Sequence, residues 1–191
     1  GNYTVNNYPF TNTQNTIGGI YLVRDPRDVL LSFSNHLKLS HEDVYGKMVS
    51  MDHFELDEND PDLKKGYKRS LLGSWSNHYL SWKSYKGREL LFLKYEDLVK
   101  NPYKNFHKVL TYLKNFVPLE LDDEKIKSSI EITSFENLKK NEEDEGFIER
   151  GMSREFFRKG IIGDWKSSLR PELLNKIESK FKKEMMELGY I

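Results

Sequence analysis

Two short apolar segments interrupt an otherwise polar chain. Residues 19–23 read Gly-Ile-Tyr-Leu-Val, residues 90–93 read Leu-Leu-Phe-Leu, and a polar turn follows each of them. Continuous apolar runs of this length, ending in polar turns, are typical of strands buried in a parallel sheet. We therefore predict two buried strands.

Helical patterns lie between and after these strands. Asp25 is suited to cap a helix and Pro26 to begin it, so the first helix is expected from residue 26 to about residue 39. Residues 63–85 have helical periodicity, with large apolar side chains recurring on one side: Leu71, Leu72, Trp75, Tyr79 and Trp82.

The second half of the chain is expected to be mostly helical. Helices are predicted over residues 102–114 and 122–132, and Thr133-Ser134 is expected to cap a further short helix. The last helix is expected to begin at Pro171 and to run to residue 188, with Gly189 as its stop.

Three polar segments are predicted to be loops. Residues 1–16 carry no charge and are rich in Asn and Thr, whose side chains compete for backbone hydrogen bonds. Residues 41–63 are acidic, which favours an irregular surface loop, and the highly charged residues 139–155 are expected to form a mobile loop.

Together these elements predict an α/β fold in which helices flank a parallel sheet, built as one domain over residues 1–191. Ligands of such sheets bind at the carboxyl ends of the strands. Arg24 follows the first predicted strand and Tyr95 follows the second, so both are expected at that edge.

Composition narrows the classes of function. The 191 residues include 30 basic, 30 acidic and no Cys residues, so neither a disulfide framework nor a thiolate site is available. Zero net charge gives no reason to expect nucleic acid or an anionic membrane as a partner. No apolar run is long enough to span a bilayer and no leader opens the chain, so we expect a cytoplasmic protein. The carboxylates and the five His show no metal-ligand spacing, so no metal is expected.

The segment Arg24-Asp25-Pro26-Arg27-Asp28 could bind an anion. An Arg at a strand end, facing a helix N-terminus, offers a guanidinium, free backbone N–H groups and the positive end of the helix dipole. Ser32, two turns into the helix, would add a hydroxyl. A structural ion pair between Arg24 and Asp28 explains the same residues equally well.

A second cationic segment lies near the C-terminus. Phe156-Phe157-Arg158-Lys159-Gly160 places two cations beside a Gly, which lets the backbone approach a phosphate, and two aromatic rings that could stack on a base. Arg150, Arg154 and Arg158 also share helical spacing, which a solvated basic face would explain.

These segments resemble the cytosolic-type sulfotransferase family. Val23-Arg24-Asp25-Pro26-Arg27-Asp28-Val29 with Ser32 is similar to the family's 3′-phosphate segment, and residues 157–166 (FRKGIIGDWK) are similar to its C-terminal nucleotide loop. Three further matches fall in the family's order: Gly73-Ser74-Trp75, residues 92–98 (FLKYEDL) and Thr133-Ser134-Phe135. The resemblance extends over nearly the whole chain, and it implies a P-loop nucleotide-kinase-like sheet.

The resemblance assigns roles to individual residues. The expected donor is 3′-phosphoadenylyl sulfate (PAPS) and the expected product is adenosine 3′,5′-bisphosphate (PAP). The residues expected to hold the 3′-phosphate are Arg24, Ser32, Arg158, Lys159 and Gly160. Those expected around the adenine are Tyr95, Thr133, Ser134 and Phe135, with Phe156 and Phe157 flanking the nucleotide. Plain core packing is an alternative for Tyr95 and Phe135.

The chain departs from the family pattern at its beginning. The family's 5′-phosphosulfate loop and catalytic His precede the Arg24 segment, but residues 1–18 contain neither His nor Lys. We therefore expect the fold to be incomplete at the N-terminus and the catalytic His to lie upstream of Gly1. Residues 167–171 also lack the family's Thr-Val dimer pattern, which leaves the oligomeric state open.

The expected function is transfer of a sulfuryl group from PAPS to a hydroxyl or amine of a small-molecule acceptor. This chain would supply the 3′-phosphate and adenine side of the donor site. Two alternatives are a non-catalytic nucleotide-binding remnant or half of a split enzyme, and a P-loop nucleotide kinase.

Overall fold

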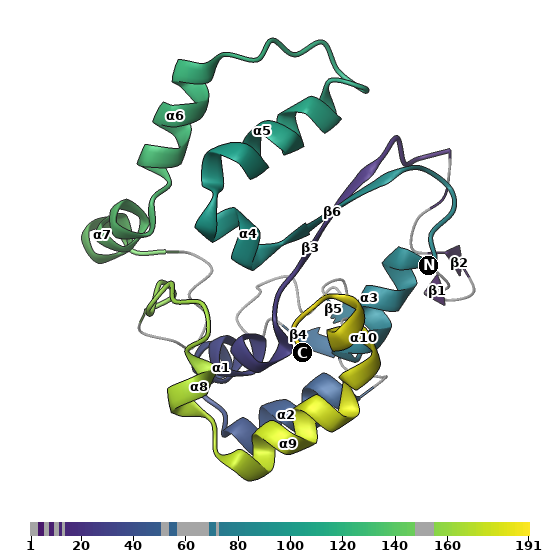
Figure 1. Ribbon diagram of the computed structural model, residues 1–191, viewed down its shortest axis with the longest axis vertical. Helices are drawn as coiled ribbons and strands as arrows, with labels where there is room; N and C mark the ends of the chain where they lie inside the picture. Colours follow the sequence, from purple (N-terminus) through teal and green to yellow (C-terminus); the bar gives the residue numbers. More distant parts are fainter. Residues whose placement is uncertain are drawn as a thin grey trace.

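A parallel pair of strands passes through the middle of the molecule (Figure 1). The computed structural model describes residues 4–5, 8–9, 12, 14–50, 54–56, 69–71, 73–147 and 155–191. Strand β3 (Gly19–Val23) pairs in parallel with β6 (Leu90–Lys94), with Gly19 opposite Leu90 and Val23 opposite Lys94. Both predicted strands and their parallel pairing are confirmed.

Four shorter strands form two antiparallel pairs. Strand β1 (Thr4–Val5) pairs with β2 (Tyr8–Pro9), and β4 (Phe54–Leu56) pairs with β5 (Arg69–Leu71). The loop predicted for residues 1–16 was therefore wrong at β1 and β2, and the helix predicted from residue 63 was wrong at β5. Backbone pairing between segments decides such short strands, and helical periodicity within one segment does not reveal it.

The helix that follows β3 begins as predicted. Helix α1 (Pro26–Leu37) is capped by Asp25, whose side chain accepts a hydrogen bond from the backbone N–H of Arg27. It ends at Lys38, whose φ of 54° turns the chain into a left-handed conformation. Helix α2 (His41–Val49) comes next, so the acidic loop predicted for residues 41–63 was wrong over these residues and again at β4. Residues 51–53 and 57–63 of that predicted loop lie outside the described residues.

The remaining helices include the predicted ones, with several changed boundaries, and two short helices that were not predicted, α4 and α8. They are α3 (Trp75–Lys83), α4 (Tyr95–Lys100), α5 (Pro102–Leu113), α6 (Asp123–Ile132), α7 (Phe135–Glu145), α8 (Trp165–Ser168), α9 (Pro171–Lys180) and α10 (Lys182–Glu187). Helix α7 replaces the first part of the mobile loop predicted for residues 139–155, while residues 148–154 lie outside the described part. The predicted last helix is interrupted at Phe181, and Gly189 follows it with φ of 68°.

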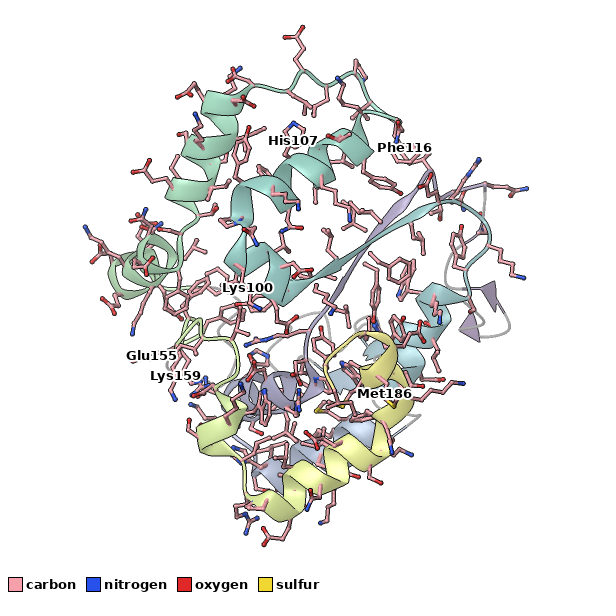
Figure 2. All side chains as sticks on the ribbon, viewed as in Figure 1. Lys100, His107, Phe116, Glu155, Lys159 and Met186 are labelled. Carbon is pink, nitrogen blue, oxygen red and sulfur yellow. The ribbon has the colours of Figure 1, made fainter. Side chains whose placement is uncertain are left out.

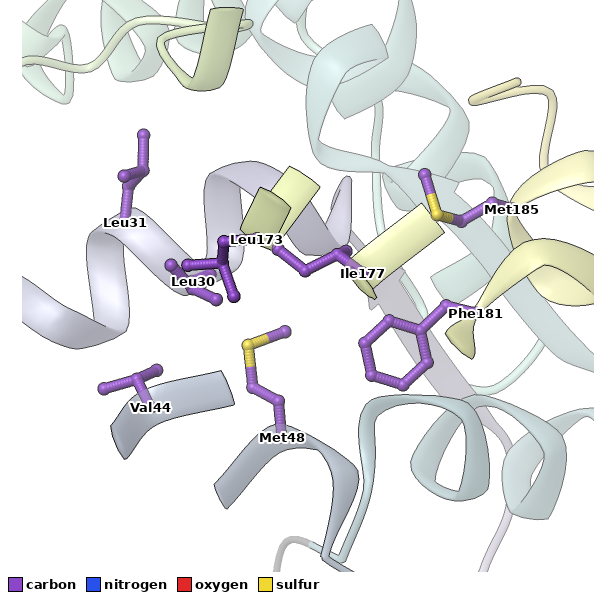
Figure 3. Close-up of a cluster of buried hydrophobic side chains, with 8 residues drawn as sticks. All are labelled: Leu30, Leu31, Val44, Met48, Leu173, Ile177, Phe181 and Met185. Carbon is purple, nitrogen blue, oxygen red and sulfur yellow. The ribbon is translucent and has the colours of Figure 1, made fainter. Parts of the chain in front are cut away.

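The largest buried cluster joins the first helices to the last ones (Figure 3). We call α1, α2, α3, α8, α9 and α10 the core region. Its central side chains are contributed by α1, α2, α9 and α10: Leu30, Leu31, Val44, Met48, Leu173, Ile177, Phe181 and Met185. A second cluster packs Tyr21 and Val23 of β3 against Tyr79 of α3. The opposite face of β3 is more open, because Ile20 is 44% exposed and Leu22 is 49% exposed.

Helices α5, α6 and α7, which we call the α5–α7 region, extend away from this core (Figure 1). Helix α5 contacts β6 and α6, and α6 contacts α7. Within residues 102–145, all of which the structure describes, the buried apolar side chains are Tyr112 and Ile126. This region therefore depends on far less apolar burial than the core region does.

Candidate functional site

A buried hydrogen-bond network fixes the carboxyl ends of the two parallel strands. The Glu96 carboxylate accepts a bond of 2.9 Å from the backbone N–H of Asp25 and one of 3.0 Å from the Tyr190 hydroxyl. Burial first, and then the Glu96 charge, raises the pKa of Tyr190 well above its usual range. Glu96 therefore joins the end of β3 to the start of α4 and to the end of the chain.

Arg27 belongs to this framework and is not free to bind a ligand. Its guanidinium bonds to Asp25, to Glu178 at 2.6 Å and to the Tyr190 carbonyl at 2.9 Å, and it stacks 3.8 Å from the centre of the Trp165 ring. A buried cation with this many partners is a structural group. Of the two arginines in the first motif, Arg24 is therefore the candidate for ligand binding.

Arg24 lies at the strand end with unused donor capacity. Its guanidinium carbon is 4.3 Å from the centre of the Tyr95 ring, and Nη2 donates a bond of 3.4 Å to the Ile161 carbonyl. The Nε–H is buried without a hydrogen-bond partner. A buried unpaired donor is costly, so its presence beside a polar loop points to a ligand group.

The alternative partner of Arg24, Asp28, serves a different purpose. The Asp28 carboxylate accepts backbone N–H bonds from Gly163 at 2.6 Å and from Trp165 at 3.1 Å. Asp28 is 2% exposed, so these bonds lie in a buried site in the first turn of α1. The first and second sequence motifs are therefore joined through this one carboxylate.

Residues 155–164, which we call the 155–164 loop, follow α1 from its last turn to its first. Asn35 Nδ2 donates 3.3 Å to the Glu155 carbonyl, and the His36 ring meets Phe156 edge-on with ring centres 6.2 Å apart. At the other end of the loop, Gly163 is held by Asp28. Ser32 is exposed and lies four positions after Asp28 and three before Asn35, the spacing of residues on one helix face. Arg24, before the helix, contacts the same loop at Ile161.

The two loop cations share one carboxylate. Arg158 Nη2 lies 2.7 Å from Asp164 Oδ2, and Lys159 Nζ lies 2.8 Å from Asp164 Oδ1. The hydrogen bond from Lys159, followed by that from Arg158, lowers the pKa of Asp164 below its ordinary value. Figure 2 shows Lys159 and Glu155 on the segment between α7 and α8.

Gly160 is the point where this loop meets α7. Its φ is 63°, a left-handed conformation that glycine adopts without strain. A Cβ atom at this position would lie 2.5 Å from the Phe135 ring. Position 160 therefore requires glycine both for its backbone conformation and for the close approach of Phe135.

The aromatic side chains form one cluster beside the loop. Phe135 meets Phe157 edge-on at 6.2 Å between ring centres, and Phe156 meets Phe157 at 5.2 Å. Phe147, which the sequence analysis did not single out, lies 4.8 Å from Phe156 and 5.2 Å from Phe157. The structure therefore brings the three predicted phenylalanines together and adds a fourth.

Helix α7 holds the start of the loop through Glu142. Its carboxylate accepts the backbone N–H of Phe156 at 2.5 Å and that of Phe157 at 2.9 Å, and Glu142 is 7% exposed. Glu142 lies in the charged segment for which a mobile loop was predicted, so this role was not predicted. Its position in a run of acidic residues gave no signal that it is buried.

Thr133 and Ser134 lie in the turn before α7. Tyr95, which is also predicted near the adenine, is the first residue of α4. The Thr133 hydroxyl donates 2.7 Å to the Ser129 carbonyl, and the Ser134 hydroxyl accepts the Asn137 N–H at 3.4 Å as the predicted cap. Both hydroxyls therefore serve the α6–α7 turn, directly before Phe135. Tyr95 lies under the Arg24 guanidinium.

The described histidines lie on helices. His36 is on α1, His41 begins α2, His78 is on α3 and His107 is on α5, while His53 lies outside the described residues. His78 Nδ1 is 2.9 Å from the Tyr21 hydroxyl, and burial lowers the pKa of His78.

The described part of the chain contains neither a cluster of metal ligands nor a membrane-spanning helix. Over the described ranges, no three His, Asp or Glu side chains gather closely enough to hold a metal ion. None of the helices in that part of the chain combines the length and apolar composition that crossing a bilayer requires.

Comparison with known proteins identifies the family. The family model described as "Sulfotransferase domain" matches residues 10–189. The chain is 30% identical over 187 residues to Sulfotransferase 1B1 of Canis lupus familiaris, covering 90% of this chain and 56% of the relative. It is 28% identical over 185 residues to Cytosolic sulfotransferase 16 of Arabidopsis thaliana, covering 90% of this chain and 52% of that protein.

The fold agrees with this comparison. Mouse sulfotransferase SULT7A1, solved in complex with PAP, matches with a TM-score of 0.66 and 25% identity, covering 93% of this chain and 61% of that one. Retinol dehydratase, solved with retinol and PAP, shares the fold with a TM-score of 0.63 and 23% identity, over 92% of this chain and 49% of that one. The chain spans about half the length of the curated relatives it matches. With its parallel sheet, its strand-end arginine and this family match, the chain belongs to the sulfotransferase family.

Proposed function

We propose that the protein is a PAPS-dependent sulfotransferase and that this chain forms the 3′-phosphate and adenine side of the donor site. One observation carries the proposal: the buried, unpaired Nε–H of Arg24 lies beside the loop that presents Arg158 and Lys159. Three cations and one carboxylate, Asp164, leave two net positive charges here. That charge suits a phosphate monoester, which carries about −1.5 to −2 at neutral pH.

The loop conformation also fits a phosphate. Gly160 adopts a left-handed conformation, which lets backbone N–H groups turn toward an anion. The exposed Ser32 hydroxyl lies on the α1 face that the loop follows. We assign the 3′-phosphate to Arg24, Ser32, Arg158, Lys159 and Gly160.

The aromatic cluster supports an adenine site next to that phosphate. Phe135 contacts Gly160, so the cluster of Phe135, Phe156 and Phe157 lies directly beside the phosphate groups. Aromatic faces stack on bases with a gain of about 1–3 kcal/mol per base. We place the adenine among these rings, with Tyr95, Thr133 and Ser134 around it.

In the reaction, the sulfuryl group of PAPS passes to a hydroxyl or amine of a small-molecule acceptor. The donor must be held in line with the acceptor, a base must take the acceptor proton, and charge on the leaving phosphate must be stabilised. Arg24, Arg158 and Lys159 would hold the nucleotide during this step. Neither the base nor the groups that hold the reacting 5′ end are assigned to residues of this chain.

We expect the protein to be located in the cytoplasm.

Nucleotide titration tests the site assignment. Calorimetry on the protein should show that Arg24→Ala and Arg158→Ala each weaken PAP binding by several-fold to a hundredfold, because charge-assisted bonds to phosphate contribute about 1.5–3 kcal/mol each. Binding of 5′-AMP, which lacks the 3′-phosphate, should change far less.

The matched control is Arg170→Ala, which removes a guanidinium paired with Glu42 on the exposed surface. It should leave both affinities unchanged. Equal losses for PAP and 5′-AMP in the Arg24 or Arg158 variant would contradict the 3′-phosphate assignment. Preference for ATP over PAP in a competition assay would favour a nucleotide kinase instead.

A turnover assay with radiolabelled PAPS and a panel of hydroxyl and amine acceptors tests the activity. We expect residues 1–191 alone to bind PAP without transferring the sulfuryl group, and a version extended upstream to transfer it. Binding without transfer by both versions would support a non-catalytic nucleotide-binding protein.

A further inference from the structure

Asp164 is the common partner of the two loop cations. Its side chain is 8% exposed, whereas those of Arg158 and Lys159 are 33% and 43% exposed. Each carboxylate oxygen bonds one cation, and the Ser168 hydroxyl lies 3.4 Å from Oδ1. A buried carboxylate therefore holds two partly exposed and otherwise flexible side chains.

Asp164 is itself held firmly by the core region. It lies between Gly163 and Trp165, whose backbone N–H groups both donate to Asp28 in the first turn of α1. Asp28 is 2% exposed and cannot move without disturbing the helix. A chain of contacts thus runs from α1 through Asp28 to the loop backbone, and from there through Asp164 to the two cations.

Both cations keep donors for a ligand while they are bound to Asp164. A guanidinium has five N–H donors, and the Arg158 bond to Asp164 is made by Nη2. An ammonium has three donors, and Lys159 uses one of them on Asp164. Fixing a free Arg or Lys side chain costs up to about 2 kcal/mol of rotamer entropy. Holding both in advance would spare a ligand much of that cost.

We propose that Asp164 is a positioning residue that holds Arg158 and Lys159 so that their remaining donors face the 3′-phosphate. The proposal rests on the proposed function, since it takes the 3′-phosphate of PAP as the ligand. If phosphate instead pulled both cations away, Asp164 would be left as an unpaired buried charge, which is strongly unfavourable. The phosphate therefore binds with Asp164 still in place.

The direction in which one substitution changes the affinity for PAP distinguishes positioning of the cations from competition between carboxylate and phosphate. Asp164→Asn removes a negative charge near an anion site, so competition between carboxylate and phosphate predicts tighter PAP binding. Positioning predicts the opposite, a loss of about 3- to 30-fold, because both cations lose the carboxylate that orients them. Binding of 5′-AMP should change by less than about 2-fold. Glu124→Gln, which neutralises a carboxylate in an exposed pair with Lys127, is the matched control and should change neither affinity.

A second variant keeps the charge constant. Asp164→Glu preserves the carboxylate but displaces it by one methylene. Positioning therefore predicts weaker PAP binding, whereas competition predicts no change in PAP affinity. It also provides the test if Asp164→Asn does not fold, as monitored by circular dichroism. In an Arg158→Ala/Lys159→Ala background, where the residues through which Asp164 acts are gone, Asp164→Asn should have no further effect on PAP binding.

The outcomes are distinguishable. Tighter or unchanged PAP binding by both Asp164 variants overturns the positioning role, as does an undiminished effect in the double-alanine background. Equal losses for PAP and 5′-AMP show a purely structural role and also overturn it. If the unsubstituted protein does not prefer PAP to 5′-AMP, the proposed function itself fails, independently of Asp164.

Discussion

The core region and the α5–α7 region are both built from helices, but they bury very different numbers of apolar side chains. In the core region, Leu30, Ile177, Phe181 and Met185 are each fully enclosed. In residues 102–145, Tyr112 and Ile126 are buried and most neighbouring positions are polar and exposed. The two regions are therefore expected to differ in how readily they open.

The candidate nucleotide site draws on both regions. Arg24 and Asp28 belong to the end of β3 and the start of α1, and Asp28 fixes the end of the 155–164 loop there. In α7, Glu142 holds the start of that loop and Phe135 contacts it at Gly160. Regions with few buried contacts open at low free-energy cost. The comparison therefore predicts that the proposed phosphate side is rigid and that the proposed adenine side can move apart from it.

The largest effect is expected in the core region. Phe181→Ala should lower the free energy of unfolding by about 3–5 kcal/mol, because the ring is 0% exposed and its loss leaves a cavity among α2, α9 and α10. Urea unfolding followed by circular dichroism measures this change. A loss below about 1 kcal/mol would show that the cluster is not the main source of stability.

The corresponding substitution in the α5–α7 region should act locally. Ile126 is 2% exposed, and Ile126→Ala should cost about 2 kcal/mol, at the low end for such a change because the surroundings can collapse. Hydrogen exchange should accelerate over residues 102–145 while α1 and α9 keep their protection. Equal acceleration in both regions would show that they unfold as one unit.

Substitution at the contact between the two regions should weaken nucleotide binding. Gly160→Ala places a residue with a Cβ in a left-handed backbone conformation, which costs about 1–2 kcal/mol, and it adds a clash with Phe135. PAP and 5′-AMP should therefore both bind several-fold more weakly. The double variant Gly160→Ala/Phe135→Ala should lose less than the sum of the two single losses, because the clash is then absent. Strict additivity of the two losses would argue against that contact.

The smallest expected effect is on the pH dependence of stability. Burial keeps the pKa of His78 below its ordinary value of 6.5, so the unfolded chain binds the proton more readily than the folded one. Its contribution to stability is present above pH 6.5 and is lost as pH falls toward the lower folded pKa. Urea midpoints from pH 8 to 5 should therefore fall less in His78→Gln than in the unsubstituted protein. His107→Gln, on α5, is the control, and an identical slope in all three proteins would contradict the assignment.

Short sequence patterns correctly predicted part of the fold. Asp25-Pro26 marked the start of α1, and two apolar runs marked β3 and β6. The sequence prediction was wrong at α2: acidic residues such as Glu42 and Asp43 are typical of a surface loop, but here they follow the N-cap Ser40 and favour a helix N-terminus. Val44 and Met48, four positions apart, are the buried side of that helix, and this spacing could have revealed it.

The residues of the candidate site also differ in whether the sequence could predict them. Arg24, Arg158, Lys159 and Gly160 could be named from motifs, and their role in binding nucleotide stays a prediction. Asp28, Glu142 and Asp164 could not be assigned from sequence, because a carboxylate in a charged segment is ordinarily solvated. The partners of Asp28 come from a distant segment, as in the Asp28–Gly163 bond across 135 positions. Those of Asp164 and Glu142 are nearer in sequence, at 5 and 6 and at 14 and 15 positions, but only the folded loop turns them toward these carboxylates.

The contribution of the last helices to the largest buried cluster bears on how the protein is made. Leu173, Ile177, Phe181 and Met185 complete a cluster begun by Leu30 and Val44. Arg27 likewise bonds to the Tyr190 carbonyl, 163 positions later. During synthesis, the emerging α1 and α2 therefore lack this part of their apolar packing until residues 173–185 have left the ribosome. Such exposed surface is prone to aggregate, so a nascent chain stalled before residue 171 should be a preferred client of chaperones.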